Sequence, residues 1–414
     1  MVTIFGLGFV GLTTAVGLAE KGYQVYGVDI NNQRKKTIAS GRLPFLEPGL
    51  DKGLTRNLNK NFFVCEDLAK AISNSEYVFY CVGTPCDDNG EADLGYLFKA
   101  IDQTLEVIND NKFRVLIIKS TIPPSTTEEK IVPYLVSKGY QVGEHLGIAN
   151  NPEFLREGHC WDDFMNPDRI VVGVNDEKSK QMLESLYMPF KAPFFAVNHN
   201  TGEFIKYLSN TILATLISYA NEMSVVAQMI GHIDTAKAFK ILHMDKRWED
   251  CKMTSYLYPG CGYGGYCLPK DTNAIYALAK SKGFEPKILE NVIKVNNNMP
   301  DIIADRVAKV ADKTDNIGIL GLSFKPGSDD VRDTPAAKII NKLFEKGFCN
   351  ITGYDPVAIE EFKKYYSKID MDYTIQLDNL IETSDVLVIV TAWSEFKGIN
   401  LKTNKPIIDG RFML

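Results

Sequence analysis

A cysteine closely followed by a lysine and an aspartate is the strongest chemical signal in the sequence. The segment Gly260–Asp271 reads Gly-Cys-Gly-Tyr-Gly-Gly-Tyr-Cys-Leu-Pro-Lys-Asp, with Cys267 ahead of Lys270 and Asp271. The cation can favour the thiolate of Cys267, and the carboxylate can manage water or protons. The many glycines let backbone amides crowd an anion or a reacting carbonyl. A lone loop cysteine is more often structural, so the functional interpretation depends on the other motifs.

Three glycines near the N-terminus form a second signal. The segment Phe5–Gly11 reads Phe-Gly-Leu-Gly-Phe-Val-Gly and lies between an apolar run and an apolar helical stretch. Gly6 permits a tight turn, Gly8 lets the backbone approach a pyrophosphate, and Gly11 lets helix and strand pack closely. A glycine turn needed only for packing is the alternative, but the surrounding strand–turn–helix–strand pattern favours a dinucleotide site.

Polar residues at the ends of other predicted strands extend this site. Asp29 ends the second strand, 18 residues after Gly11, where a carboxylate suits the ribose hydroxyls of NAD and repels the 2′-phosphate of NADP. Arg34 leaves NADP open, because a nearby arginine could meet that phosphate. Thr84 and Thr121 follow two further strands and are candidate ligand contacts, although threonines near prolines are also ordinary turn chemistry.

A nicotinamide site combined with a cysteine nucleophile predicts a four-electron oxidation of a primary alcohol. Loss of one hydride gives an aldehyde, and attack by the thiol gives a thiohemiacetal that can lose a second hydride. Hydrolysis of the resulting thioester gives a carboxylate, and the developing oxyanions need fixed hydrogen-bond donors. Lys206 and Asn210, four residues apart on one predicted helix, could supply these donors. The same spacing is also common on solvated helix faces.

Composition and charge argue against several other classes of protein. The net charge is −6 over 414 residues, without a long Lys/Arg cluster, so nucleic acid is not expected as a partner. No stretch approaches the roughly 20 apolar residues that cross a bilayer, and the N-terminus lacks the features of a signal peptide. The eight cysteines show no spacing typical of a disulfide framework or a zinc site. We therefore expect no metal, no membrane association and a location in the cytoplasm.

The order of the apolar runs predicts two α/β lobes around a helical middle. Strand-like runs alternate with amphipathic stretches at first, which indicates a parallel, doubly wound sheet. Helical spacing then continues from Thr201 for about thirty residues, a loop follows at Tyr256–Pro269, and the strand–helix pattern resumes at Asn316. The predicted strands are Val2–Phe5, Gln24–Val28, Tyr77–Val82, Val115–Lys119, Leu146–Asn150, Ile170–Val174, Ile351–Tyr354, Val386–Val390 and Pro406–Ile408.

These motifs and two further segments resemble the UDP-glucose 6-dehydrogenases. Asn151–Gly158 reads Asn-Pro-Glu-Phe-Leu-Arg-Glu-Gly, Gly321–Pro326 reads Gly-Leu-Ser-Phe-Lys-Pro, and the resemblance spans nearly the whole chain. It implies an α/β fold with two Rossmann-like doubly wound domains joined by a long central helix, and a homodimer. The domains it implies are an NAD-binding domain at 1–200, a helical dimerisation domain with the cysteine loop at 201–300, and a UDP-sugar-binding domain at 301–414.

The resemblance also implies a role for individual residues. Cys267 would be the covalent nucleophile, Lys206 and Asn210 would stabilise the oxyanions, and Asp271 would hold or activate water. The full catalytic set implied is Cys267, Lys206, Asn210, Asp271, Thr121 and Glu153. The implied NAD contacts are Gly6, Gly8, Val10, Gly11, Asp29, Arg34, Thr84, Thr121, Glu157, Lys270 and Arg332, which favours NAD over NADP. The implied contacts to UDP-glucose are Glu153, Phe154, Leu155, Arg156, Glu157, Lys206, Asn210, Arg247, Tyr256, Leu257, Tyr258, Pro259, Gly260, Gly264 and Lys325.

Three alternatives remain open beside UDP-glucose oxidation. GDP-mannose 6-dehydrogenases share the cysteine-loop chemistry, but Asp163–Ile170 looks more like the UDP-glucose group. The dehydrogenases of UDP-N-acetylhexosamines typically differ in the segment Leu268–Asp271 that follows the nucleophile. A non-catalytic nucleotide-sugar sensor is a third alternative, and retention of the whole catalytic set argues against it. UDP-glucuronate, the product implied, commonly feeds capsule and other surface polysaccharides.

Overall fold

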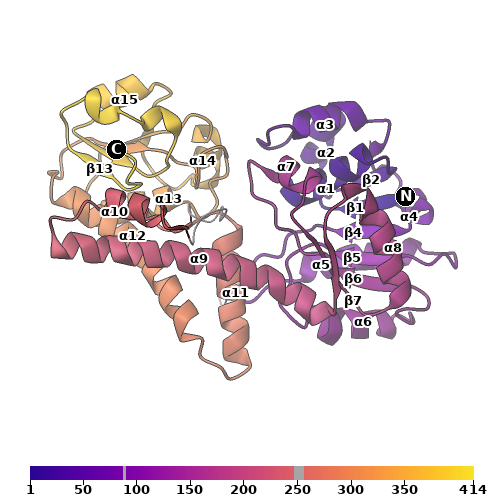
Figure 1. Ribbon diagram of the computed structural model, residues 1–414. Helices are drawn as coiled ribbons and strands as arrows, with labels where there is room; N and C mark the ends of the chain where they lie inside the picture. The colour runs from indigo at the N-terminus through magenta and orange to yellow at the C-terminus, as the bar shows by residue number, and fades with distance from the viewer. Residues whose placement is uncertain (87–89, 247–255) are drawn as a thin grey trace. The chain divides into compact units, whose positions relative to one another are not determined.

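The computed structural model describes residues 1–86, 90–246 and 256–414. The chain divides into two compact units, Met1–Leu208 (unit 1) and Ser209–Leu414 (unit 2), and each contains its own β-sheet (Figure 1). The sheets and their covering helices confirm the predicted α/β class with two Rossmann-like sheets. The finer division into three domains at 1–200, 201–300 and 301–414 stays a prediction.

The sheet of unit 1 has the strand order β3-β2-β1-β4-β5-β6-β7-β8, which begins with the order typical of dinucleotide-binding folds. The apolar runs predict all of these strands except β3 and β8, which are short and only partly buried. The strands are β1 (Val2–Phe5), β2 (Val25–Val28), β3 (Phe62–Val64), β4 (Tyr77–Tyr80), β5 (Val115–Ile118), β6 (Gly147–Asn150), β7 (Ile170–Val174) and β8 (Phe194–Val197).

The prediction of a parallel sheet holds for β1 to β6 and is wrong between β6 and β7. These two strands are antiparallel, with Ala149 opposite Val174. A parallel connection needs a long crossover that returns the chain to the starting edge. The segment between β6 and β7 contains only the short helix α7 (Cys160–Met165), so the chain re-enters the sheet from the edge at which it left.

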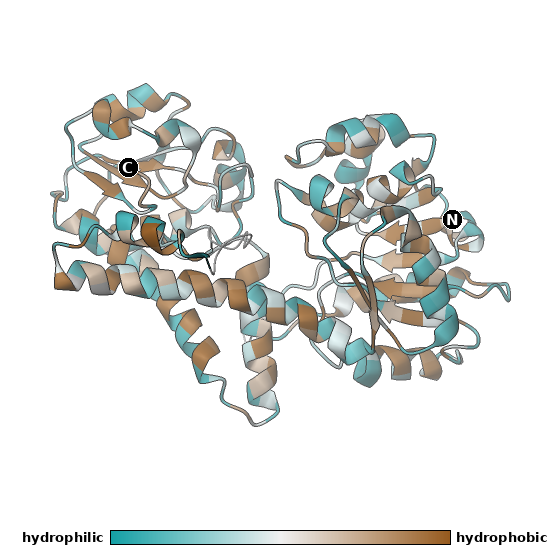
Figure 2. Ribbon diagram, in the orientation of Figure 1, coloured by the Kyte–Doolittle hydropathy of each residue, from teal (hydrophilic) through white to brown (hydrophobic). Residues whose placement is uncertain are grey.

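Helices cover both faces of this sheet, and the strands alternate their side chains between two cores. Phe79 of β4 belongs to the core under α1, α3, α7 and α8, whereas Val78 and Tyr80 belong to the core under α4, α5 and α6. Figure 2 shows the apolar strands between helices whose outer faces are hydrophilic. The helices are α1 (Phe9–Glu20), α2 (Asn32–Ala39), α3 (Leu50–Asn57), α4 (Leu68–Asn74), α5 (Gly95–Val107), α6 (Val132–Ser137), α7 and α8 (Glu177–Tyr187).

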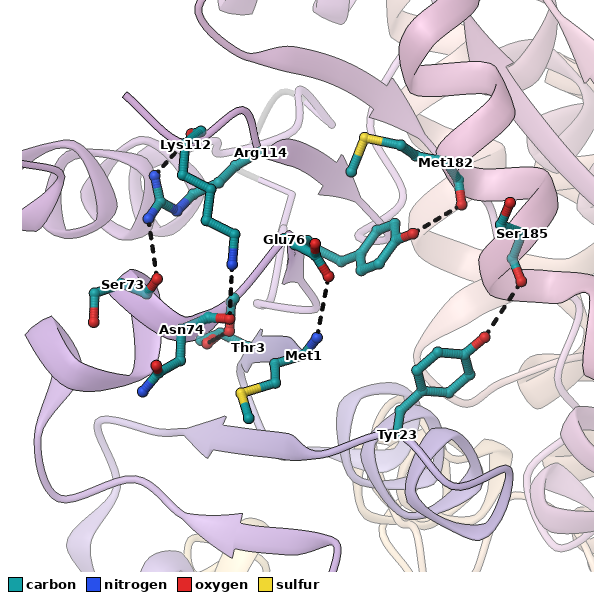
Figure 3. Close-up of polar contacts among 12 residues, drawn as sticks. Met1, Thr3, Tyr23, Ser73, Asn74, Glu76, Lys112, Arg114, Met182 and Ser185 are labelled. Carbon is teal, nitrogen blue, oxygen red and sulfur yellow. Dashed lines mark hydrogen bonds and ion pairs between the residues drawn. The ribbon is translucent and has the colours of Figure 1, made fainter. Parts of the chain in front are cut away.

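Polar contacts to backbone carbonyls fix the amino-terminal edge of the sheet (Figure 3). Lys112 donates from Nζ to the carbonyl of Asn74 at 3.0 Å, and the buried Arg114 donates to the carbonyl of Ser73 at 3.4 Å. The Tyr23 hydroxyl donates to carbonyls in α8. The carboxyl ends of the strands, where ligands bind in open α/β sheets, lie at the opposite edge.

The long helix predicted from Thr201 is confirmed as α9 (His199–Ile230), a continuous helix of 32 residues. Unit 2 contains the sheet β11-β10-β9-β12-β13. Its strands are β9 (Ile317–Leu320), β10 (Ile351–Tyr354), β11 (Asp372–Tyr373), β12 (Val386–Ile389) and β13 (Ile407–Asp409). Its further helices are α10 (Thr235–Leu242), α11 (Cys267–Ser281), α12 (Lys287–Ala308), α13 (Pro335–Glu345), α14 (Ile359–Tyr365) and α15 (Leu377–Thr383). Within the described ranges, no helix combines the length and apolar character of a membrane span.

Unit 2 repeats the glycine and aspartate positions of unit 1. Gly321 follows β9 with φ +97°, as Gly6 follows β1 with φ +85°. Asp355 follows β10, as Asp29 follows β2. The Asp355 carboxylate is saturated, because its two oxygens accept from the backbone N–H groups of residues 322, 323, 357 and 358, from the Ser323 hydroxyl and from the Trp393 indole.

Candidate active site

The glycine turn after β1 has the geometry that a dinucleotide requires. A Cβ on Gly6 would lie 2.6 Å from the carbonyl oxygen of Cys81, and a Cβ on Gly11 would lie 1.7 Å from the carbonyl oxygen of Gly6. Both positions therefore exclude any larger residue. A Cβ on Gly8 would meet nothing within 4 Å, so the backbone is open there, at the N-cap of α1. A helix N-terminus with an approachable backbone suits a pyrophosphate. Val10 lies half-buried in the first turn of α1.

Asp29 organises this turn with both carboxylate oxygens. Its Oδ2 accepts from the backbone N–H of Leu7 at 2.7 Å, and its Oδ1 accepts from the N–H of Asn31 at 2.7 Å. Arg34 donates from Nη1 to Oδ2 of Asp29 at 3.0 Å. The predicted ribose acceptor and the predicted arginine thus form one ion pair beside the glycine turn.

Thr84 and Thr121 lie together, as the strand order predicts for residues that follow β4 and β5. The Thr84 hydroxyl donates to the backbone carbonyl of Thr121 at 2.8 Å. This hydrogen bond joins the ends of the two strands. Thr84 is buried, with 3% of its surface exposed, whereas Thr121 is half-buried.

Lys206 and Glu153 form a buried ion pair in unit 1. Lys206 Nζ lies 2.7 Å from Glu153 Oε1, and Oε2 of Glu153 accepts from the N–H of Leu155 at 2.6 Å. Burial opposes the charge on Glu153, but Lys206 and the Leu155 amide outweigh it and lower the pKa of this carboxyl. A second cation, Lys119, lies in the same region, and burial lowers its pKa. It donates to the Asn151 side chain at 2.9 Å.

The rest of the segment after Glu153 runs toward the surface. Phe154 and Leu155 are half-buried, and the Arg169 guanidinium lies 4.2 Å from the centroid of the Phe154 ring. Arg156 is exposed and forms an ion pair of 2.6 Å with Asp163. The structure therefore brings Glu153 and Phe154 toward Lys206, whose Nζ is 5.8 Å from that ring, and directs Arg156 elsewhere.

In unit 2 the predicted catalytic residues gather at the start of α11. Cys267 is the first residue of this helix, so the prediction of a loop through Pro269 is wrong for its last three residues. Lys270 and Asp271 follow three and four residues after Cys267 and form a buried ion pair. Burial opposes the charge on Lys270, but the Asp271 carboxylate outweighs it and raises the pKa of the lysine. A helix N-terminus and an ammonium group both favour negative charge on a nearby sulfur.

Asn210 of α9 completes this group. Its Nδ2 donates to Oδ2 of Asp271 at 2.5 Å, and Asp271 is fully buried. Asn210 is 6% exposed and Lys206 is 4% exposed, so the alternative of a solvated helix face is wrong for both.

The loop before α11 packs against the segment that follows β9. A Cβ on Gly264 would lie 2.4 Å from the carbonyl oxygen of Asp333, and one on Gly265 would lie 2.8 Å from the Phe324 ring. Arg332 lies 4.5 Å from the ring of Tyr266, the residue before Cys267. Glycines at these positions thus let the two segments close together. Lys325, half-buried, lies in the same segment, and Glu157 is half-buried in unit 1.

The predicted substrate loop is held by contacts within unit 2. The N–H of Gly260 donates to the Asn221 side chain at 2.7 Å, and the Tyr258 hydroxyl donates to the carbonyl of Phe412 at 2.9 Å. Leu257 and Pro259 are buried, while Tyr256 and Tyr258 are half-buried. Arg247 lies outside the described residues.

Two buried charged residues near Lys206 are not among the site residues predicted from the sequence. Lys119 ends a predicted strand, and Glu203 precedes Lys206 by one helical turn on α9. The helical spacing of Glu203 and Lys206 is a usable signal, because residues three apart share a helix face. The burial of Lys119 has no equivalent signal in a single sequence.

Comparison with known proteins agrees with this architecture. Family models of the UDP-glucose/GDP-mannose dehydrogenase family match the NAD-binding domain at residues 1–191, the central domain at 200–298 and the UDP-binding domain at 318–414. A UDP-glucose 6-dehydrogenase of Rickettsia bellii is 37% identical over 406 residues, which cover 96% of this chain and 91% of that protein. TuaD of Bacillus subtilis, a UDP-glucose 6-dehydrogenase, is 35% identical and covers 99% of this chain and 88% of its own length.

Solved structures give the same result. A UDP-glucose dehydrogenase from Pyrobaculum islandicum has a TM-score of 0.92 and 33% identity, and covers 100% of this chain and 94% of its own. The UDP-D-ManNAc dehydrogenase of Pyrococcus horikoshii has a TM-score of 0.86 and 29% identity, with 100% and 96% covered. The fold and the glycine turn define an NAD-dependent oxidoreductase. The chain belongs to the UDP-glucose/GDP-mannose dehydrogenase family.

Proposed function

We propose that this protein oxidises the C6 alcohol of UDP-glucose to the carboxylate of UDP-glucuronate, with reduction of NAD. The observation that carries the proposal is Cys267 at the first residue of α11, followed within one turn by the buried pair Lys270–Asp271 and joined by Asn210. The substrate assignment is supported by relatives whose names specify UDP-glucose and that match nearly the whole chain.

The residues of the chain divide the work between thiol chemistry and charge stabilisation. The Cys267 thiolate attacks the C6 aldehyde to form a thiohemiacetal, and the later thioester is hydrolysed by water that Asp271 orients. Lys206 and Asn210 hold the oxyanion of each tetrahedral stage. Glu153, ionised beside Lys206, takes part in the acid–base steps, and Thr121 contributes to the water network.

The residues around the glycine turn fit NAD. Two NAD molecules, bound there one after the other, would each accept one hydride on the nicotinamide ring. The open backbone at Gly8 and the start of α1 would hold the pyrophosphate, and Asp29 would hold the ribose. Thr84, Glu157, Lys270 and Arg332 complete the proposed NAD contacts.

Side-by-side assays test the substrate. Purified protein is given NAD with UDP-glucose, GDP-mannose or UDP-N-acetylmannosamine, and the formation of NADH is followed by its absorbance. We expect about two NADH per UDP-glucose and little from the others. NADH from another sugar nucleotide instead would transfer the assignment to that substrate, and none from any would favour a sensor.

A homodimer in the cytoplasm is the proposed state of the protein. Three apolar residues recur at a spacing of four on α9 and are exposed, namely Phe204 (46%), Leu208 (54%) and Ile212 (46%). Such a stripe favours burial against a second copy. Light scattering on the wild type and on Ile212→Glu tests this, because the variant should be a monomer if α9 forms the interface.

A further inference from the structure

Glu203 is a buried carboxyl group to which the reaction described above assigns no role. It lies on α9 and is 3% exposed. Its Oε1 accepts from the backbone N–H of Thr127 at 2.8 Å and from the Thr127 hydroxyl at 2.6 Å. The neighbouring backbone amides of Ser125 and Thr126 lower the pKa of this carboxyl, but they make no hydrogen bond to its second oxygen within the described part of the chain. Glu203 thus fastens the turn that follows Thr121 to the helix that carries Lys206.

The second carboxylate oxygen of Glu203 is used differently. Oε2 is buried and has no hydrogen-bond partner within the described part of the chain. A buried acceptor without a hydrogen bond lowers the stability of the fold, and an ordered water molecule commonly supplies the missing donor.

A small cavity in unit 1 offers the place for that water. Glu203, Lys206, Thr121 and Ser120 are among its lining residues. Its volume of about 10 Å³ is close to what one water molecule needs. The cavity therefore has room for a single water among Glu203, the proposed oxyanion donor Lys206 and the proposed water-network residue Thr121.

We propose that Glu203 is a positioning residue of this dehydrogenase, which holds one water against Lys206 and Thr121 while it fastens the Ser125–Thr127 turn to α9. The inference deepens the proposed function and rests on it. A carboxylate in this place keeps the ammonium group of Lys206 and the water in fixed relative positions, which an oxyanion site requires.

The charged groups around Glu203 come from several elements of unit 1. Lys206 and His199 share α9 with it, Glu128 follows Thr127, and Glu153 and Lys119 lie near Lys206. Burial raises the pKa of Glu203 to about 7, although the amides of residues 125 to 127 lower it. Its protonation state therefore changes near neutral pH, and the water it holds should change with it.

Glu128 provides a matched control. Its Oε1 lies 2.7 Å from Nδ1 of His199, so it also joins the segment after Thr127 to α9. It does not line the cavity. Glu203→Gln keeps an oxygen that can accept from Thr127 and removes the negative charge. Glu128→Gln makes the same change in the contact between Glu128 and His199.

The experiment measures kcat, the KM values for UDP-glucose and NAD, and the pH profile of kcat for wild type, E203Q and E128Q. We expect E203Q to lower kcat by about 10- to 100-fold with little change in either KM, and to lose an ionisation near neutral pH. E128Q should retain both kcat and the profile. An E203Q enzyme with wild-type kcat and pH profile overturns the inference alone, and so does an equal loss in E128Q. A wild type that makes no NADH from any sugar nucleotide overturns the proposed function as well.

Discussion

Asn210 donates a hydrogen bond to Asp271 at 2.5 Å, and this contact joins the long helix α9 to the helix that begins with Cys267. Asp271 also pairs with Lys270, so its buried carboxylate has a neutral and a cationic partner. The amide of Asn210 is therefore oriented by Asp271 before any substrate binds. Such an oriented donor costs little reorganisation during a reaction.

Removal of this amide should slow the chemistry more than it weakens binding. For Asn210→Ala we expect kcat to fall about 10²- to 10³-fold, because one oriented oxyanion donor is lost. The control is Asn273→Ala, since the Asn273 side chain donates to the Pro269 carbonyl in its own helix. Steady-state NADH assays measure kcat and KM for both variants. A change confined to KM would contradict the role of Asn210 as an oxyanion donor.

The thiol of Cys267 should be indispensable for turnover and dispensable for binding. We expect Cys267→Ser to bind UDP-glucose like the wild type in calorimetry and to lose at least about 10³-fold in kcat, because a hydroxyl is a poorer nucleophile and leaving group here. Cys349→Ser, a change at an exposed cysteine, should leave turnover intact. Full activity in the Cys267 variant would remove the covalent mechanism.

Two glycines of the N-terminal turn should fail for different reasons. Gly8 has φ −75° and open space around its position, so Gly8→Ala should fold normally yet weaken NAD binding by about tenfold or more, because the methyl group occupies the approach of the pyrophosphate. Gly11→Ala should instead lower the unfolding temperature, since its methyl group meets the Gly6 carbonyl. Equal NAD affinity in Gly8→Ala and wild type would argue against this cofactor site.

The charge of Asp29 should set the choice of cofactor. Asp29→Asn keeps one oxygen, which can accept from the N–H of Leu7 or of Asn31 but not from both, and it removes the negative charge that pairs with Arg34. The freed guanidinium can then meet a 2′-phosphate. We expect the ratio of kcat/KM for NAD over NADP to fall by about tenfold or more. An unchanged ratio would mean that the carboxylate serves the turn alone.

Glu203 should make stability depend on pH. Burial raises its pKa from 4.5 to about 7, so this group contributes stability that is full at low pH and is lost as pH rises through neutrality. Relative to E203Q, the wild type should lose up to about 3 kcal/mol of unfolding free energy between pH 5 and 8. Urea unfolding at several pH values measures this, with E128Q as the control. Parallel pH curves for E203Q and wild type would contradict the raised pKa.

The local motifs could be predicted from the sequence because they depend on short-range geometry. The glycine turn, the Asp29 position and the long helix α9 follow from spacing alone. The antiparallel step between β6 and β7 could not be predicted, because strand direction depends on the path of the connection. The position of Cys267 at the start of a helix could not be predicted either, because the glycines before it favour one continuous loop through Pro269. The unpartnered oxygen of Glu203 could not be predicted either, because it depends on the tertiary contact in which Thr127 bonds to the other oxygen.

The saturated carboxylate of Asp355 has a consequence for the order of events. Its six donors leave no free acceptor for a ribose, so the second sheet lacks the acidic ribose contact that the proposed cofactor site has at Asp29. In the proposed reaction, the one cofactor-binding site beside the N-terminal glycine turn then serves both oxidations. Reduced cofactor has to depart and a fresh molecule has to enter while the half-oxidised sugar stays bonded to sulfur, and the lifetime of that bond must outlast the exchange.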